Sequence, residues 1–227
     1  MTAIEATLDP REKKSFSFHA TTFRKFLVGS ARLLFGLFMQ LEVQGLEHFP
    51  VAGPVIVAAN HVSNYDPFLM QFSLPRPIFY MGKASLFKFP VMDIALRNLG
   101  AFPVYRGEKD AWALLHARRI LDHGQVLGMF PEGTRSKGRG LGVAKTGVAR
   151  LALETNCTIS PMTIIGTDLF FQQIPQRTTV KVQILAPLHP NKNETPLALT
   201  DRLMFALAAA LPEKIRGVYA QTPAGFN

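Results

Sequence analysis

The sequence predicts an α/β domain in which a mostly parallel central sheet is wrapped by helices. Two continuous apolar runs, VIVAAN (55–60) and VLGMF (126–130), have the length and composition of buried strands. Segments with helical periodicity separate such runs along the chain, as in the connections between parallel strands. The 227 residues, of which 48% are hydrophobic and 18% charged, suit one domain with a packed core.

We divide the chain after residue 40. Residues 1–40 would hold a frayed polar tail and an N-terminal amphipathic helix near 18–40, and residues 41–227 the main domain. The helical stretch carries one charge, Arg32, between Phe26 and Leu41. A membrane-spanning helix needs about 20 apolar residues with few charges, so this stretch is too short and interrupted. It is expected to lie in a membrane interface, and the alternative is a helix packed on the domain's own core.

The remaining elements follow in order from the first buried run. Asp66 and Pro67 predict the start of a helix at 66–74, as its N-cap and first helical residue. Residues 179–185 alternate apolar and polar side chains, which predicts a half-exposed strand near a sheet edge. The other patterns predict a strand at 76–82, short helical pieces to 100, an extended segment at 101–107, a helix at 108–124, a strand at 125–130, a glycine-rich loop at 131–142, a helix at 143–156, a buried strand at 158–166 and a last helix at 196–211.

The charge balance indicates an anionic partner without choosing among nucleic acid, lipid headgroups and a phosphorylated substrate. The net charge is +9. The single cysteine, Cys157, excludes an internal disulfide and fits a reducing compartment, and we expect it to be a small buried hydrophobe. No metal site is expected, because the chain has no His-Glu-x-x-His pattern and no cysteine pair. His116 and His123 are expected on the surface.

The stretch NHVSNYDP (60–67) follows the first buried strand. If Asp66 caps the next helix, its carboxylate can turn back to His61, fix the imidazole tautomer and leave the other ring nitrogen free to take a proton. Asn60 and Ser63 would then shape the loop by hydrogen bonds. The alternative is a capping aspartate beside a histidine with no chemical role. The chain has no Gly-x-Ser-x-Gly turn, so a base here would activate a substrate hydroxyl or water.

A second polar stretch, FPEGTRSKGRG (130–140), follows another buried strand. Gly133, Thr134 and Arg135 offer a backbone N–H, a hydroxyl and a guanidinium, which together suit a phosphate. The alternative is a charged surface turn. Loops at the carboxyl ends of parallel strands face one crevice, so this stretch and His61 are expected to meet. Three further cations, Arg106, Lys83 and Lys145, are weak signals when taken singly.

Together these stretches resemble the glycerolipid acyltransferases, the family of lysophosphatidate and glycerol-3-phosphate acyltransferases. NHVSNYDP resembles the N-H-x-S-x-x-D block of that family, and FPEGTRS matches its F-P-E-G-T-R-S block. GAFPVYR resembles the block between them, and KTGVARLA and ISPMTIIG are similar to later blocks. The similarity covers roughly residues 40–170 in the right order and spacing. It favours the reading of His61 as a base.

The resemblance implies an acyl transfer with no covalent acyl-enzyme. His61, oriented by Asp66, would deprotonate the free hydroxyl of 1-acylglycerol-3-phosphate, which then attacks a thioester and yields phosphatidic acid. The resemblance implies that Gly133, Thr134 and Arg135, helped by Arg106, hold the acceptor's phosphate, with Lys83 and Lys145 as further contacts. Glu132 matches the motif, and its role, ligand contact or loop brace, is open.

The resemblance also implies the partners and the location. Acyl-CoA or acyl-carrier protein would serve as donor co-substrate, with no other cofactor and no nucleic acid. The protein would associate peripherally or monotopically with the cytoplasmic face of a membrane. Three alternatives remain: the same chemistry on glycerol 3-phosphate, another lysophospholipid or an amino-acid lipid; a hydrolase that passes the acyl group to water; and a non-enzymatic binder of membranes or nucleic acid.

Overall fold

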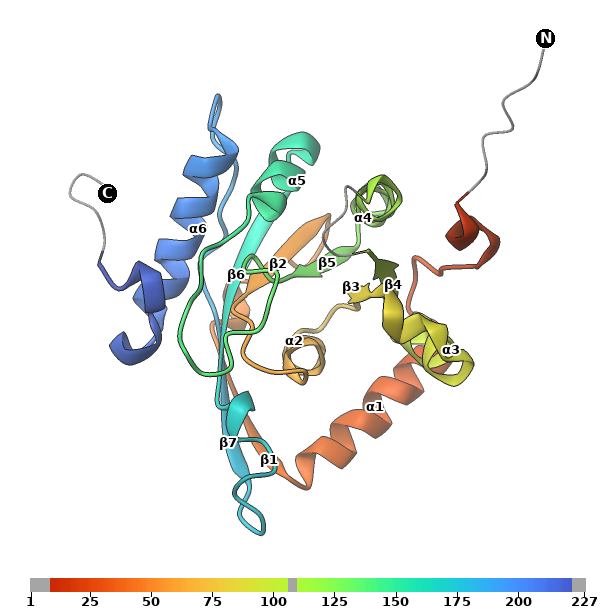
Figure 1. Cartoon of the computed structure of the whole chain (residues 1–227), viewed down its shortest axis with the longest axis horizontal. Helices are drawn as coiled ribbons and strands as arrows, with labels where there is room; N and C mark the ends of the chain where they lie inside the picture. Colours follow the sequence, from red (N-terminus) through yellow and green to blue (C-terminus); the bar gives the residue numbers. More distant parts are fainter. Residues whose placement is uncertain (1–8, 106–109, 222–227) are drawn as a thin grey trace.

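A seven-stranded sheet lies at the centre of the molecule, which we describe from a computed structural model covering residues 9–105 and 110–221 (Figure 1). The strand order is β1-β7-β6-β2-β5-β3-β4, and every pairing is parallel except that of β6 with β7. This confirms the predicted mostly parallel sheet. The strands are β1 Met39–Gln44, β2 Val55–Ala59, β3 Ile78–Lys83, β4 Ala101–Val104, β5 Val126–Met129, β6 Thr158–Ile165 and β7 Thr178–Ile184.

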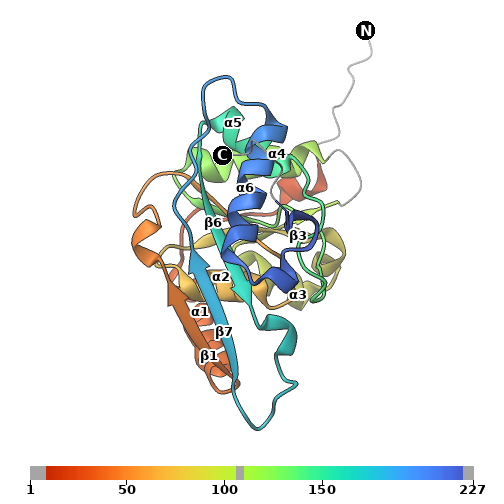
Figure 2. The same cartoon turned by 90° about the vertical axis from the view of Figure 1, so that its left-hand side faces the viewer.

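Helices cover both faces of the sheet, and Figure 2 shows the sheet from its β1–β7 side with α6 packed across it. The six α-helices are α1 Thr22–Gly36, α2 Asp66–Ser73, α3 Pro90–Asn98, α4 Ala111–Asp122, α5 Gly147–Thr155 and α6 Pro196–Ala210. Short 3-10 helices η1 Pro10–Lys13, η2 Leu46–His48, η3 Ala84–Lys88, η4 Thr167–Leu169, η5 Glu213–Ile215 and η6 Gly217–Tyr219 lie between or after them.

The central strand β2 shows why a continuous apolar run forms a strand here. Ile56 and Ala58 point into the core under α4, α5 and α6, whereas Val55, Val57 and Ala59 point into the core on the side of α1 and α2. All five residues are fully buried. A parallel strand with helices on both faces has no solvent side, so alternation is lost.

The first strand, β1, was not predicted, because the expected helix near 18–40 was drawn too long. The helix α1 is confined to Thr22–Gly36, and the chain then pairs with β7 from Met39 onward. As the edge strand, β1 has only one neighbour and carries the polar residues Gln40 and Glu42, which hide its strand character in the sequence. The predicted alternating strand is β7, which lies next to β1 and has alternately buried and exposed residues.

Helix α1 has apolar side chains on two opposite sides. Arg24, Val28, Ala31 and Phe35 recur at helical spacing and pack on the core, with Arg24 donating to the Ile78 carbonyl and lying over the Phe79 ring. The inner side of α1 therefore packs on the domain's own core, as the alternative interpretation expected, and the outer side, described below, is also apolar. Among the described residues, no helix is long and apolar enough to cross a membrane.

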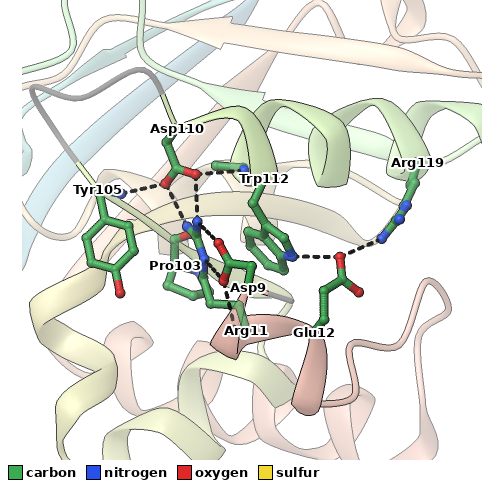
Figure 3. A network of polar contacts seen from close by, with 9 residues as sticks. Asp9, Arg11, Glu12, Pro103, Tyr105, Asp110, Trp112 and Arg119 are labelled. Carbon is green, nitrogen blue, oxygen red and sulfur yellow. Dashed lines mark hydrogen bonds and ion pairs between the residues drawn. The ribbon is translucent and has the colours of Figure 1, made fainter. Parts of the chain in front are cut away.

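Residues 9–15 of the polar tail are held by specific contacts, contrary to the expectation that the tail is frayed, and residues 1–8 lie outside the described residues. The guanidinium of Arg11 donates to Asp9, to both carboxylate oxygens of Asp110 and to the Pro103 carbonyl, and it lies over the rings of Tyr105 and Trp112 (Figure 3). Asp110 also caps α4 and accepts the Tyr105 N–H, at 2.8 Å. Burial raises the pKa of Asp110, but the bonds from Arg11 and two backbone amides outweigh it and lower that pKa. The N-terminal segment thus fastens β4 to α4.

His116 is buried, which corrects the expectation that it lies on the surface, whereas His123 is exposed as expected. The His116 ring stacks on Trp112 at 4.9 Å between centroids. Burial, together with the nearby Arg119 and Arg11, lowers the pKa of His116 to about 4, and Glu12 partly opposes this shift. The side chain is therefore a neutral part of the core between α4 and the N-terminal segment.

We expect Arg11→Met to lower the free energy of unfolding by about 3–5 kcal/mol, because it leaves the buried Asp110 carboxylate without its cation. Urea unfolding followed by circular dichroism measures this. The matched control is Arg119→Met, which removes an exposed ion pair with Glu12 and should cost less than about 1 kcal/mol. Equal losses in the two variants would contradict the role of Arg11 in fastening β4 to α4.

We expect stability to fall as the pH drops from about 6.5 towards 4, because the unfolded chain then takes up a proton that the folded His116 does not. When folding lowers a pKa, the folded state keeps its full stability above the pKa of the unfolded chain and loses stability as the pH falls below that value. The loss from this group reaches about 2–3 kcal/mol near pH 4. Urea unfolding at pH 7 and pH 4.5 should show a smaller loss in His116→Phe than in the unaltered protein, and an equal loss would count against this origin.

Candidate active site

The site begins at the carboxyl end of β2, where the Asn60 side chain continues the hydrogen-bonding pattern of the sheet. Asn60 is buried, its amide nitrogen donates to the Ile164 carbonyl, and its amide oxygen accepts the Ile164 N–H, each at 2.8 Å. The side chain thereby imitates a further rung between β2 and β6. Asn60 fixes where β2 ends and where the next residue, His61, is presented.

His61 and Asp66 meet, as the sequence predicted. The His61 Nδ1 lies 2.7 Å from the Asp66 Oδ2, and the Asp66 side chain is fully buried. A carboxylate at Nδ1 holds the proton on that nitrogen and leaves Nε2 as the acceptor. The His61 ring stacks on Phe130, with 3.9 Å between centroids and 14° between planes. The ring is thus held at one edge and on one face.

Asp66 is not the N-cap of α2, which corrects the prediction. The residue at the N-cap position is Tyr65, and Asp66 is the first residue of α2. Its Oδ2 accepts the backbone N–H groups of Val62 and Ser63, at 2.7 and 2.8 Å, which lie before it rather than within the helix. The carboxylate therefore closes the loop back on itself. Ser63 shapes the loop as predicted, because its hydroxyl donates to Asp66 Oδ1 and accepts the Tyr65 N–H.

Thr167 completes this network and was missed by sequence reasoning. Its hydroxyl donates to Asp66 Oδ1 at 2.6 Å, and the residue is buried in η4, after β6. The two residues are 101 positions apart, so no local pattern could pair them. The only signal was the position of Thr167 just beyond a buried strand neighbouring β2.

Glu132 braces two loops, which answers the question the sequence left open. Its Oε1 accepts the His61 N–H and its Oε2 accepts the Gly142 N–H, each at 2.9 Å. The side chain is buried, and burial raises its pKa although both N–H groups act to lower it. The Ser136 N–H donates to the His61 carbonyl at 2.7 Å. The glycine-rich loop is therefore fastened to the histidine loop from two sides.

The far end of the glycine-rich loop is held by the C-terminal residues. The Leu141 N–H donates to the Ile215 carbonyl at 3.1 Å, and the Leu141 carbonyl accepts the Val218 N–H at 3.0 Å. The Ala144 N–H donates to the Tyr219 hydroxyl at 3.1 Å. Gly140 and Gly217 lie so close that a Cβ on Gly140 would stand 2.9 Å from the Gly217 nitrogen. Backbone bonds thus fix the loop at both of its ends.

The predicted phosphate-binding residues are partly brought together. Gly133 has φ of 66°, and the Lys145 side chain lies beside it, because a Cβ there would be 3.4 Å from Nζ. Thr134 and Arg135 are exposed, and Arg135 makes no ion pair within the described ranges. Arg106 lies outside the described residues.

A pocket of about 300 Å³ lies between His61 and Lys145. His61, Gly133 and Lys145 line it, together with Tyr80 and Tyr105. Lys83 does not line this pocket and instead lines a neighbouring one with Lys14 and Lys88, on the other side of Val104 and Tyr105. Within the part of the chain that the structure describes, no three His, Cys, Asp or Glu side chains gather to hold a metal ion. Burial raises the pKa of Cys157 to about 12, as expected for a small buried hydrophobe.

Several known proteins are similar to this chain in sequence. The 1-acyl-sn-glycerol-3-phosphate acyltransferase of Borreliella burgdorferi is 33% identical over 135 residues, which are 59% of this chain and 54% of that protein. The chloroplastic 1-acyl-sn-glycerol-3-phosphate acyltransferase LPAT1 of Arabidopsis thaliana is 29% identical over 162 residues, covering 68% of this chain and 45% of that protein. The chain thus spans about half the length of these two curated relatives.

Two further likenesses extend over more of the chain. The human 1-acyl-sn-glycerol-3-phosphate acyltransferase alpha is 27% identical over 208 residues, which are 86% of this chain and 72% of that protein. The crystal structure of the 1-acyl-sn-glycerophosphate (LPA) acyltransferase PlsC from Thermotoga maritima superposes with a TM-score of 0.69 at 25% identity, covering 82% of this chain and 77% of that one.

The family model described as Acyltransferase matches residues 40–165, which are 126 of the 227 residues. The matched range contains the His61–Asp66 turn, the glycine-rich loop and Lys145, the residues that the geometry brings to one pocket. The chain belongs to the acyltransferase family.

Proposed function

We propose that the protein transfers a fatty acyl group from a thioester to the free hydroxyl of 1-acylglycerol-3-phosphate, forming phosphatidic acid for phospholipid biosynthesis. The observation that carries this proposal is the pocket in which His61, held by Asp66, lies beside Gly133 and Lys145. A base and an anion-binding group in one pocket suit an acceptor that carries both a hydroxyl and a phosphate. Relatives from bacteria, plants and animals bear the name of this activity.

The reaction proceeds by direct transfer. The Nε2 of His61 takes the hydroxyl proton as the acceptor oxygen bonds to the thioester carbonyl carbon. The carbon–sulfur bond then breaks, and the proton passes from His61 to the leaving sulfur, which releases the thiol and restores the imidazole. Asp66 stabilises the imidazolium in between and keeps its orientation. The donor is acyl-CoA or acyl-carrier protein, and no metal or further cofactor enters a step.

The acceptor's phosphate would be held by the loop that Glu132 braces. Gly133 offers its N–H, Thr134 its hydroxyl and Arg135 its guanidinium, with Arg106 as a further cation. Lys145 already lies against Gly133, whereas Lys83 reaches the acceptor only from the neighbouring pocket. The exposed Arg135 is free to close on a ligand because it has no competing carboxylate in the described structure.

The substrates are lipids, so we propose that the protein associates peripherally with the cytoplasmic face of a membrane. The outer side of α1 supports this, because Phe26, Leu33 and Leu37 are more than half exposed. These three positions fall within about 40° of one another around the helix axis, opposite Arg24. An apolar stripe on the solvent side of a surface helix is typical of interfacial helices.

The test is an acceptor and donor panel on the purified protein in detergent or lipid. Lysophosphatidate is compared with glycerol 3-phosphate, other lysophospholipids and an amino-acid lipid, and acyl-CoA with acyl-carrier protein. If the protein acylates another acceptor but not lysophosphatidate, the acceptor is that other compound and not 1-acylglycerol-3-phosphate. Steady thioester hydrolysis without any acceptor would instead indicate a hydrolase.

We expect His61→Ala to lower kcat by at least about 10²–10⁴, the contribution of a positioned general base, while the protein stays folded. The initial rate of phosphatidic acid formation gives the activity, and circular dichroism gives the folded state. The control is His123→Ala, an exposed histidine outside the pocket, which should keep its turnover. Near-normal turnover of His61→Ala would show that the base is another group.

We expect Arg135→Ala to raise the KM for lysophosphatidate by about 10- to 100-fold, because a charge-assisted hydrogen bond contributes about 1.5–3 kcal/mol. The KM for the thioester should change little. Arg139→Ala is the matched control in the same loop, since Arg139 donates to the Ser136 carbonyl and is also exposed. If both arginine variants raise the acceptor KM alike, the loop's general charge, rather than Arg135, holds the phosphate.

A further inference from the structure

Two segments besides α1 expose large apolar side chains. Phe89, between η3 and α3, is 68% exposed, and Val91 and Ile94 of α3 are 80% and 54% exposed. In the turn between η4 and β7 the residues Phe171 and Ile174 are 44% and 57% exposed. Contiguous apolar surface of this kind on a soluble domain marks a place where another phase or molecule binds.

These segments adjoin α1 at its two ends. Thr21 and Arg24, at the start of α1, line the same small pocket as Arg97 and Asn98, at the end of α3. Past the other end of α1, the ring of Phe38 lies 5.1 Å from that of Phe171. In Figure 1, α1 and α3 together form the lower-right boundary of the molecule. Residues 86–94, the outer side of α1 and residues 169–174 therefore make one surface, which we name the apolar face.

The exposed charges on this face are of one sign. Residues 22–38, 84–92 and 169–177 contain no aspartate or glutamate. Their exposed cations include Lys25, Arg32, Lys88 and Arg177. Asp93 within the face is buried and paired with Lys14 and Arg97, and the exposed Asp168 borders the face. Lys25 and Arg32 lie one above the other, seven residues apart on α1, and line a groove of about 370 Å³ with Arg76. Gly29, between them, leaves the groove open, because a Cβ there would meet nothing within 4 Å.

We propose that the apolar face docks on an anionic lipid bilayer, with η3 and α3 as a second contact element beside α1 and the Lys25–Arg32 groove as the site of a lipid phosphate. The proposal rests on the proposed function in so far as the substrates are lipids. Apolar side chains enter the acyl boundary of a bilayer while flanking cations bind its anionic headgroups. A protein partner would not explain why the exposed charges on all three segments of the face are cations.

Docking in this orientation brings lipid to the catalytic turn. Phe35 of α1 and Phe170 of the adjoining turn both pack on Tyr65, with ring centroids 6.0 and 4.9 Å away. Tyr65 directly precedes Asp66. The apolar face and the His61–Asp66 pair are therefore separated by one layer of aromatic rings.

The first test alters η3–α3 alone. Phe89→Gln/Val91→Gln is compared with Leu114→Gln/Leu197→Gln, two exposed leucines on α4 and α6, which cover the other face of the sheet. Binding is measured by cosedimentation with vesicles of equal parts phosphatidylcholine and phosphatidylglycerol. We expect the first pair to weaken binding at least tenfold and the second pair less than twofold. Equal binding of the two double variants would overturn the role of α3.

The second test alters charge. Lys25→Gln/Arg32→Gln is compared with Arg150→Gln/Lys192→Gln, two exposed cations elsewhere. On the same vesicles we expect about a fivefold loss for each charge of the first pair, and none on vesicles of phosphatidylcholine alone. An equal loss in both pairs would show attraction by net charge only and would overturn the groove.

A third measurement separates this proposal from the proposed function. The variants are assayed with a short-chain acyl-CoA and a short-chain lysophosphatidate that stay dispersed in water, where docking is not needed. Unchanged turnover there, with reduced turnover on vesicles, supports the docking surface. Vesicle binding without any acyl transfer would overturn the function and leave the surface standing. Acyl transfer on vesicles that the variants do not affect would overturn the surface and leave the function standing.

Discussion

The buried carboxylate of Asp66 is the interaction on which the rest of the site depends. It accepts hydrogen bonds from the ring of His61, the amides of Val62 and Ser63, and the hydroxyls of Ser63 and Thr167. A carboxylate taken out of water costs several kcal/mol unless such donors replace the lost hydration. Because these donors come from β2's end, α2's start and η4, the carboxylate can be buried only when all three are in place. Orientation of the histidine follows from folding rather than from ligand binding.

The glycine-rich loop depends on a second buried carboxylate used in a different way. Glu132 accepts only backbone N–H groups, one from His61 and one from Gly142. It therefore sets the distance between the His61 loop and the glycine-rich loop through their backbones alone. This division leaves Arg135 and Lys145 able to adapt to a ligand, while the histidine and the loop ends stay fixed.

Sequence patterns could predict the parts whose causes are local. The buried run of β2, the alternation of β7 and the approach of Asp66 to His61 across a turn follow from neighbouring residues. The predictions that failed concern residues whose partners lie far away in the sequence. Thr167 reaches Asp66 across 101 positions, the polar edge strand β1 is recognisable only from its partner β7, and the burial of His116 is completed by residues 11–18 of the tail. Lys83 is the last residue of β3, and Val104 and Tyr105 divide its pocket from that of His61.

The backbone bonds between Leu141 and residues 215 and 218 link the middle of the chain to its last described turns. Residues 215 and 218 are synthesised about 75 residues after Leu141, and they leave the ribosomal exit tunnel later still. During synthesis the histidine and its aspartate can meet early, whereas the glycine-rich loop lacks these backbone partners until residues 215–218 have emerged. The two loops of the site therefore become fixed at different times, the histidine loop first and the glycine-rich loop after it.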